Sequence, residues 1–483
     1  MQTEGDNTRT ASTAESGHQV QDLGPICCFS QESLKRPHVS KTSNWKAYSD
    51  HIDDLKLSTY DIEDCKFIDD APLVNTEFQE LHTNVVQNKQ RKAKHEHETS
   101  VSSRELKTGN SHHGLVFVTC TRADFSKMTP LLFEALTTDF PVTIWVSGMH
   151  LQVDFGSTYM EIVKRFSSTR AKIVFRPNHS KSMSQTFINT ADAFNRWLHH
   201  STDMVFVHGD RIESLACATV AVLQNIKVCH IEGGEISGTV DESLRHAITK
   251  LSHIHFVSNE SSRLRLLQLG ENDARIHVIG SPEVDAWLKN NVTFSDVKSR
   301  YEILYEEQDY LVLLFHPVTI NFDEREIKHV VDCCIMSELN FVVIKCNNDT
   351  NFETILKEYE RFEHNQHFRC LSSLRFEHFI SLIKHSNGLI GNSSVGVRET
   401  PILGIPSLNI GCRQQNRSTE AKSIIHIPDY RDLSVATLKE MKYIPHTQPV
   451  MEFGSKGGAS RFGDCLRNFD MKAINIQKYF VDM

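Results

Sequence analysis

Short apolar runs alternate with amphipathic stretches from residue 114 onward. Helical patterns such as Ser182–His199 and Arg211–Gln224 separate the apolar runs. Continuous apolar runs without polar alternation are typical of strands buried on both faces. Repeated strand–helix units therefore predict an α/β domain with a doubly wound parallel sheet over residues 111–290. The strands expected in this domain are residues 115–120, 142–146, 172–175, 204–207, 228–231 and 255–257.

A second series of the same kind begins near Tyr310, and it predicts a second Rossmann-like domain over residues 291–465. Its expected strands are residues 310–315, 341–345, 368–371 and 388–391. The closing segment, residues 466–483, has helical character across Asn468–Phe480, and we expect it to pack back toward the first domain. A ligand site is then expected in the cleft between the domains, outside the carboxyl ends of both sets of strands.

Residues 1–110 differ in composition from the rest of the chain. They are rich in Ser, Thr, Asn, Gln and charged residues, and they lack a sustained apolar pattern. This composition predicts a polar, disordered extension. The histidines in or beside it are more simply interpreted as linker residues than as metal ligands. They are His95, His97, His112 and His113.

The overall composition narrows the possible functions. The chain of 483 residues carries a net charge of −9, whereas general nucleic-acid binding calls for a basic balance. No apolar run approaches the roughly 18 residues of a membrane span, and the polar N-terminus predicts no secretory signal. The 12 cysteines form no CxxC motif, so the simplest interpretation is reduced thiols in the cytosol.

The first predicted strand ends in the motif VTCTRADFSK, which places polar residues at a strand end. Arg122 in this loop could bind a phosphate or stack on a base. Asp124 could cap the helix that follows, and a helix N-terminus favours an anion. The alternative is an arginine on the surface and a purely structural cap.

The densest group of polar residues lies between positions 208 and 245. Asp210 directly follows one strand, although it could simply cap the next helix. Glu232 ends the next strand, and Asp241 begins a helix. Carboxylates from adjoining elements could converge on one carbon for acid–base chemistry. Helix capping or a pair with Arg245 is the alternative for Asp241, whereas Glu232, which ends a buried strand, needs a partner in any case.

The second half offers groups suited to a nucleotide diphosphate. His316 follows the strand YLVLLF and could contact a phosphate or relay a proton. The segment GLIGNSSVGVRET places Ser393 and Ser394 at the start of a helix, where hydroxyls and free N–H groups can hold a pyrophosphate. Glu399, expected one to two turns into that helix, could bind two ribose hydroxyls, and Arg413 follows the next strand. The alternatives are capping by Ser393 and a surface role for Glu399.

These motifs together resemble one enzyme family, the hydrolysing UDP-N-acetylglucosamine 2-epimerases. The longest match is VHGDRIESLACATVAVLQNIKVCHIEGGEISGTVDESLRHAITKLSH, and VTCTRADFSK, FHPVT and GNSSVGVRE follow the family in order and spacing. The similarity covers about residues 114–483 and is greatest to the epimerase half of the animal enzymes that also carry an N-acetylmannosamine kinase.

The resemblance implies a GT-B fold and the conversion of UDP-N-acetylglucosamine and water to N-acetylmannosamine and UDP, the first step toward sialic acid. It implies a 2-acetamidoglucal intermediate, no NAD, metal or other cofactor, and a homo-oligomer, either a dimer or a tetramer. Catalytic positions of the family fall on Asp210, Glu232 and Asp241 as acid–base candidates, with His316 beside the diphosphate. The family's ligand contacts fall on Arg122, Ser126, Arg211, His230, Asn347, Ser393, Ser394, Glu399 and Arg413.

Three features depart from the family pattern. The sequence CNNDTNF stands where the family usually has a proline–asparagine loop, and Asn347 is expected to keep the nucleotide contact. The helix ETILKEYERFEH has mixed charge where animal relatives carry a basic cluster that senses CMP-sialic acid, so feedback inhibition is not expected. The chain ends where a kinase domain would begin, so no kinase activity is expected. A non-hydrolysing epimerase, a sugar transferase, an inactive UDP-sugar sensor and a diacetamido-sugar substrate remain alternatives.

Overall fold

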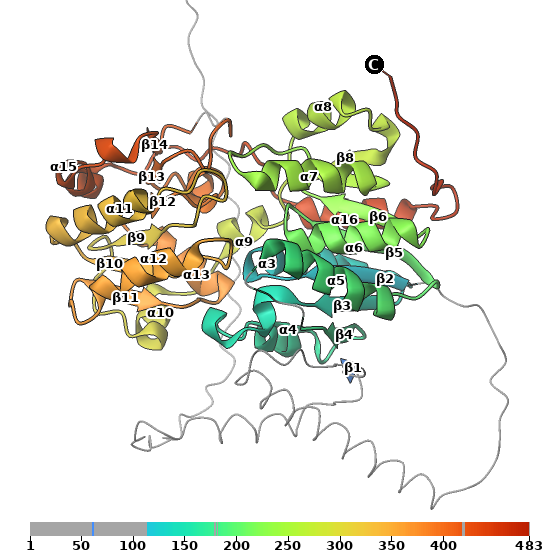
Figure 1. Ribbon diagram of the computed structural model, residues 1–483, viewed down its shortest axis with the longest axis horizontal. Coiled ribbons are helices and arrows are strands. Elements are labelled where there is room, and N and C mark those ends of the chain that lie inside the picture. Colours follow the sequence, from blue (N-terminus) through green and yellow to red (C-terminus); the bar gives the residue numbers. More distant parts are fainter. Residues whose placement is uncertain (1–59, 62–113, 178–179, 181, 418–420, 483) are drawn as a thin grey trace, which may run out of the picture. The chain divides into compact units, whose positions relative to one another are not determined.

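The computed structural model describes residues 60–61, 114–177, 180, 182–417 and 421–482 (Figure 1). Apart from Tyr60–Asp61, the extension predicted over residues 1–110 lies outside the described residues, as do the four histidines in or beside it. In the part that is described, no helix combines the length and the apolar character that a bilayer crossing requires.

The first domain is built on a parallel sheet with the strand order β1-β4-β3-β2-β5-β6-β7-β8. Its strands are β1 (Tyr60–Asp61), β2 (Gly114–Thr119), β3 (Val142–Val146), β4 (Lys172–Phe175), β5 (Thr202–His208), β6 (Lys227–Ile231), β7 (Ile254–Val257) and β8 (Ile276–Val278). Its helices are α3 (Arg122–Ala135), α4 (Tyr159–Phe166), α5 (Met183–Trp197), α6 (Ile212–Leu223), α7 (Val240–Leu251) and α8 (Glu260–Gln268).

The second domain has a parallel sheet with the order β11-β10-β9-β12-β13-β14. Its strands are β9 (Leu311–Leu314), β10 (Phe341–Ile344), β11 (Phe368–Leu371), β12 (Leu389–Gly391), β13 (Ser407–Ile410) and β14 (Ile424–Ile427). Its helices are α9 (Val284–Lys289), α10 (Phe294–Tyr301), α11 (Glu324–Ser337), α12 (Phe352–Tyr359), α13 (Phe376–Lys384), α14 (Val395–Arg398) and α15 (Val435–Glu440), and the last helix of the chain is α16 (Gly458–Asn468).

Central strands of both sheets are buried on both faces, which explains their continuous apolar sequences. In β2, Phe117 belongs to one hydrophobic cluster, and its neighbour Val116 belongs to the cluster on the opposite face. Leu313 and Val312 of β9 divide in the same way. Because successive side chains of a strand point to opposite faces, both alternating sets must be apolar where helices cover both sides. The two predicted Rossmann-like domains are therefore present.

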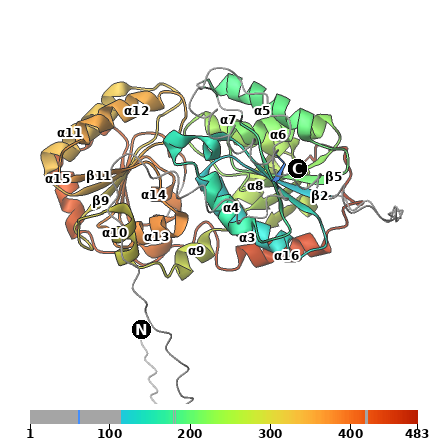
Figure 2. The ribbon, with the colours of Figure 1, turned by 90° about the horizontal axis from the view of Figure 1, so that it is seen from below.

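The last helix lies earlier in the chain than predicted. The helix predicted across Asn468–Phe480 is wrong: α16 ends at Asn468, and Phe469 already has an extended backbone. Phe462 and Leu466, one turn apart on α16, are fully buried in the first domain, where the Phe462 ring lies 4.8 Å from that of Phe256. Figure 2 shows α16 alongside α3. Burying such side chains stabilises the crossover by about 1.5–3 kcal/mol each.

The order of the strands determines where a ligand can approach. In the first sheet, β2 lies between β3 and β5, so the connections leave it in opposite directions. In the second sheet, β9 lies in the same way between β10 and β12. Such reversals open a crevice at the carboxyl ends of the strands. The segments that follow β2, β5, β9 and β12 are thus positioned to form a site.

Candidate active site

A cavity of about 310 Å³ is lined by residues from both domains. All the residues predicted for the site line it except Glu232 and His230. Glu232 lines a smaller adjoining cavity of about 130 Å³, which it shares with Asp210, Asp241 and Arg413. The predicted members of the larger cavity are Arg122, Ser126, Asp210, Arg211, Asp241, His316, Asn347, Ser393, Ser394, Glu399 and Arg413.

Asp210 follows β5 and is held as an anion. The capping role considered for it is wrong, because the N-cap of α6 is Arg211 and Asp210 forms an ion pair with Arg245. Burial would raise the pKa of Asp210, but Arg245 and then Arg417 offset this and hold the pKa at about 2. The alternative of an ion pair between Asp241 and Arg245 is also wrong, because Arg245 pairs with Asp210.

Asp241 lies in the first turn of α7 with fewer compensating charges. The N-cap is Thr239, whose hydroxyl accepts a hydrogen bond from the Asp241 N–H at 3.4 Å, so Asp241 itself is not the cap. Its ion-pair partner, Arg413, lies 3.7 Å away across the cleft. Burial and the negative charge of Asp210 raise the pKa of Asp241 to about 6. Neighbouring carboxyl groups whose pKa values are driven apart in this way are typical of acid–base sites.

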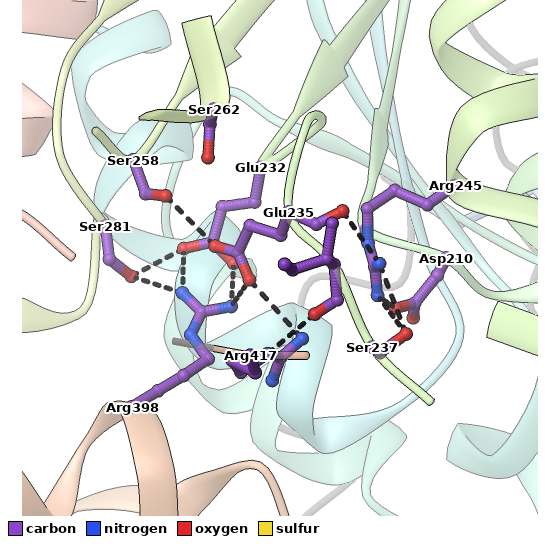
Figure 3. A network of polar contacts seen from close by, with 12 residues as sticks. Asp210, Glu232, Glu235, Ser237, Arg245, Ser258, Ser262, Ser281, Arg398 and Arg417 are labelled. Atoms are coloured by element: carbon purple, nitrogen blue, oxygen red, sulfur yellow. Dashed lines mark hydrogen bonds and ion pairs between the residues drawn. The ribbon is translucent and has the colours of Figure 1, made fainter. Parts of the chain in front are cut away.

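Glu232 accepts hydrogen bonds from Ser281 and Arg398, as Figure 3 shows. It follows β6 with a positive φ of 59°, and Arg398 binds both of its oxygens at 2.8 and 3.1 Å. Lys127 Nζ and His208 Nε2 lie 3.0 and 2.9 Å from Glu232 Oε2. Burial opposes ionisation, but Arg398 and Lys127 hold the pKa of Glu232 well below its usual value. The partner expected for this carboxylate is therefore present, and the group is fixed as an anion.

The ion pairs around Glu232 join the two domains. Arg398, at the end of α14 in the second domain, also binds Glu235 of the first domain at 2.9 Å. Lys127, on α3, reaches the second domain through Glu399 at 3.2 Å and contacts Glu283 at 2.7 Å. Removing one partner of a buried pair leaves an uncompensated charge, so these contacts favour one arrangement of the domains.

Sequence reasoning missed Lys127, Arg398, Glu235 and Glu283. Lys127 and Arg398 stand inside the motifs VTCTRADFSK and GNSSVGVRE, next to residues that were identified. A signal was available at Lys127, because it follows Phe125 and precedes Met128 in the first turns of a largely buried helix. A charged residue in such a setting needs a buried partner.

His316 and Asn347 form the wall contributed by the second domain. His316 Nδ1 accepts a hydrogen bond from the Asn347 N–H at 3.2 Å, and the His316 N–H donates to Asn392 Oδ1 at 2.7 Å. Burial and the nearby Arg413 lower the pKa of His316 to about 3. The imidazole is therefore neutral at physiological pH and can contribute a hydrogen bond but not a charge.

Helix α14 is shorter than the sequence predicted. The helix has four residues, its N-cap is Ser394, and Ser393 Oγ accepts from the Val395 N–H at 3.4 Å. Glu399 is the C-cap rather than a residue one to two turns into a helix, so that expectation is wrong. Pro401, which lacks an N–H and cannot continue the helix, lies in the 3₁₀ turn that follows. Both serine side chains nevertheless line the cavity.

The arginines of the cavity wall each have a carboxylate partner. Arg211 Nη1 donates to Asp349 Oδ1 of the second domain at 2.8 Å, and Asn347 Nδ2 donates to the other Asp349 oxygen at 2.6 Å. Arg122 lies 3.0 Å from Glu161. With Arg413, these guanidinium groups surround a space into which an anionic ligand could fit.

Three other predicted residues near β2 and β6 have local roles. Asp124 is confirmed as part of a capping box, whose N-cap is Thr121. Ser126 Oγ donates to the Ala123 carbonyl at 2.8 Å on the cavity wall. His230 is fully buried outside both cavities, where its Nε2 lies 2.7 Å from the Gly209 carbonyl and thus supports the turn before Asp210.

No group of three or more His, Cys, Asp or Glu side chains among the described residues is arranged to hold a metal ion. A reaction without a metal or other cofactor stays a prediction.

Comparisons with known proteins agree with this geometry. The profile of the UDP-N-acetylglucosamine 2-epimerase family matches residues 134–464. The UDP-N-acetylglucosamine 2-epimerase of Neisseria meningitidis serogroup B is 36% identical over 378 residues, which cover 76% of this chain and 99% of that protein. The GDP/UDP-N,N'-diacetylbacillosamine 2-epimerase (hydrolyzing) of Campylobacter jejuni is 32% identical over 394 residues, which cover 77% and 100%.

A solved structure supports the fold. The crystal structure of Methanocaldococcus jannaschii UDP-GlcNAc 2-epimerase in complex with UDP-GlcNAc and UDP has a TM-score of 0.63 at 19% identity. The match covers 73% of this chain and 99% of that one. The predicted arrangement of two Rossmann-like domains in a GT-B fold is thus confirmed.

Proposed function

The chain belongs to the UDP-N-acetylglucosamine 2-epimerase family, and we propose that it is a hydrolysing member that converts UDP-N-acetylglucosamine and water to N-acetylmannosamine and UDP. The single observation that carries the proposal is the pair Asp210 and Asp241, with pKa values of about 2 and about 6, facing a cavity lined by arginines. Inversion at C2 requires a group that exchanges a proton near neutral pH, and Asp241 is suited to this.

The proposed reaction proceeds by elimination and addition. Asp241 removes the proton at C2, the C1–O bond breaks, and UDP leaves with the bonding electrons to give a 2-acetamidoglucal. Water then adds to C1, and a proton returns to C2 from the opposite face. Asp210 stays ionised beside Arg245, and its negative charge keeps the pKa of Asp241 near the working pH.

The second domain is proposed to hold the nucleotide. Ser393 and Ser394 offer hydroxyls and N–H groups to the diphosphate, and neutral His316 adds a hydrogen bond. Arg413 supplies a permanent positive charge close to Asp241. Glu399 is placed to accept hydrogen bonds from ribose hydroxyls, and the charge of departing UDP is then stabilised by groups already in position.

The relatives support the hydrolysing type, because the Campylobacter protein is named as hydrolyzing. That name also makes a diacetamido-sugar nucleotide the second candidate substrate. The two sugars differ at C4 and C6, which are remote from the C2 chemistry, so the same carboxylates would serve both. A role in sialic acid synthesis is proposed for the first substrate only.

The test is product analysis by NMR in deuterated water. Incubation with UDP-N-acetylglucosamine is expected to release UDP and N-acetylmannosamine that carries deuterium at C2. Retained UDP-N-acetylmannosamine would indicate a non-hydrolysing enzyme, and UDP with a gluco-configured sugar would contradict epimerisation. Binding of UDP without any turnover would indicate a sensor. A parallel reaction with UDP-N,N'-diacetylbacillosamine separates the two substrates by their kcat/KM values.

A further inference from the structure

Two carboxyl groups in the wall of the larger cavity share one lysine, Lys127. Glu283 is the N-cap of α9, and Glu399 is the C-cap of α14. Both side chains contact Lys127 Nζ, at 2.7 and 3.2 Å, both residues line the cavity, and they are only 3% and 4% exposed. An ionised carboxyl group can only accept hydrogen bonds, so a hydrogen bond between the two would require a proton on one of them.

The surrounding charges indicate which group carries the proton. Glu399 has two cations beside it, since Lys127 Nζ lies 3.2 Å and Arg398 Nε 3.5 Å from its Oε1. Glu283 contacts Lys127 alone among these cations, at 2.7 Å, and Lys127 is also shared with Glu232 at 3.0 Å. Burial, Glu399 and Glu232 raise the pKa of Glu283 well above its usual value, whereas Lys127 lowers that of Glu399 against its own burial.

Counting permanent charges also indicates one proton in this cluster. The buried cluster contains four carboxyl groups and three permanent cations joined by contacts of 3.5 Å or less. A surplus buried negative charge is costly, so one carboxyl group is expected to take up a proton. His208 Nε2 lies 2.9 Å from Glu232 Oε2. The carboxyl groups are Glu232, Glu235, Glu283 and Glu399, and the cations are Lys127, Arg398 and Arg417.

We propose that Glu283 is a neutral carboxylic acid in the resting enzyme and acts as a positioning residue for Glu399. Its O–H donates to the Glu399 carboxylate and fixes the orientation of that group. Lone pairs of Glu399 that are not engaged by Glu283 or Lys127 can then accept from the two neighbouring hydroxyls of a ribose. The assignment of a ribose to this place rests on the proposed function, whereas the position of the proton does not.

Infrared difference spectroscopy at neutral pH tests the proton. The wild-type minus Glu283→Gln difference spectrum is expected to contain the carbonyl band of a protonated carboxylic acid. Glu302→Gln is the matched control, because the Glu302 side chain is exposed and its loss should leave the band unchanged. A wild-type minus Glu283→Gln difference spectrum without this band overturns the assignment.

Nucleotide binding tests the positioning. Glu283→Gln keeps a donor to Glu399, so its Kd for UDP should stay within about twofold of the wild type. Glu283→Ala removes the donor and should weaken UDP about tenfold, but it should leave the weaker binding of 2',3'-dideoxy-UDP unchanged. Equal losses for both nucleotides in a folded Glu283→Ala protein, checked by thermal melting, overturn the positioning role.

Failure of the proposed function gives a different pattern. If the wild-type protein binds no UDP, the proposed function and the positioning role both fail, while the infrared band still decides where the proton lies. If UDP binds but no sugar is converted, the proposed function fails, while the comparison of UDP with 2',3'-dideoxy-UDP still decides the positioning role.

Discussion

Two groups of carboxylates come from the same short stretch of chain, residues 208–245, yet their surroundings differ sharply. Glu232 and Glu235 form an interdomain cluster with Lys127, Arg398 and Arg417, in which every carboxylate has a cation within 3.5 Å. The cleft pair, Asp210 and Asp241, is less evenly paired. Asp210 forms an ion pair with Arg245, whereas Asp241 lies 3.7 Å from its ion-pair partner Arg413. The number of close permanent cations thus decides which carboxylate is a fixed anion and which exchanges a proton.

This difference separates structural from chemical roles. Charges in the interdomain cluster are buried and paired, so removing one should affect stability first. Asp241 takes part in one long ion pair, so replacing it should lower turnover more than stability. The following variants test the contrast.

Arg398→Met should have the largest effect on stability. It leaves Glu232 and Glu235 without their shared cation, and breaking a buried pair costs about 3–5 kcal/mol. Urea unfolding monitored by circular dichroism measures the change. Arg413→Met is the matched control, because Arg413 also lies on the second domain but contacts Asp241 only at 3.7 Å. Equal losses of unfolding free energy in the two variants would remove the distinction between the groups.

Asp241→Asn should lower kcat by about 10²- to 10⁴-fold, since the amide cannot take the C2 proton. The melting temperature should stay close to that of the wild type, because Asp241 takes part in one long ion pair. Steady-state assay of UDP release measures the rate. The adjacent Glu242→Gln serves as control, since Glu242 is about one third exposed and its replacement can still accept a hydrogen bond. Comparable rates for the two variants would exclude Asp241 as the base.

The pH profile of the reaction should report the ionisation of Asp241, with a smaller effect on the rate than the Asp241→Asn substitution. If ionised Asp241 is the base, kcat/KM should rise with pH through an apparent pKa near 6. Asp210 raises the pKa of Asp241 by repulsion, so Asp210→Asn should move this limb to lower pH, whatever its effect on the maximum rate. A limb that remains near pH 6 in Asp210→Asn argues against electrostatic coupling of the pair.

Arg165→Ala should have the smallest effect. Arg165 and Glu377 also form an ion pair between the domains, but their side chains are 30% and 35% exposed. Such a pair contributes about 0–1 kcal/mol, and salt screens it. Urea unfolding at low and high salt checks this. A loss as large as that of Arg398→Met would show that bridging the domains, rather than burial, determines the stabilising effect.

The fold was predictable to the extent that burial leaves a pattern in the sequence. Central strands such as β2 and β9 are buried on both faces and therefore appear as apolar runs. The short strands β8 and β14 lie at sheet edges and were missed, since fewer of their residues are buried. The end of the last helix was misplaced because Asn468–Phe480 contains apolar residues that pack without helical structure.

The residues of the candidate site were predictable for a related reason. Carboxyl ends of parallel strands meet at one edge of each sheet, so polar residues after apolar runs converge whatever the details of packing. Asp210, Asp241, His316 and Arg413 were reached in this way, and the cavity contains all four. His230, which is a strand residue rather than a loop residue, was expected at the ligand but supports the Gly209 turn instead.

Sequence alone therefore determined two Rossmann-like domains, the family, and the polar residues at the strand ends. Only the tertiary structure decided which charges pair. Lys127 meets Glu399 across 272 positions, and Arg398 meets Glu232 across 166. A pKa depends on burial and on charges within a few ångströms, and neither can be read from spacing along the chain. For that reason Glu232, Asp241 and Glu283 look alike in the sequence, but one is a locked anion, one titrates near pH 6 and one is proposed to carry a proton.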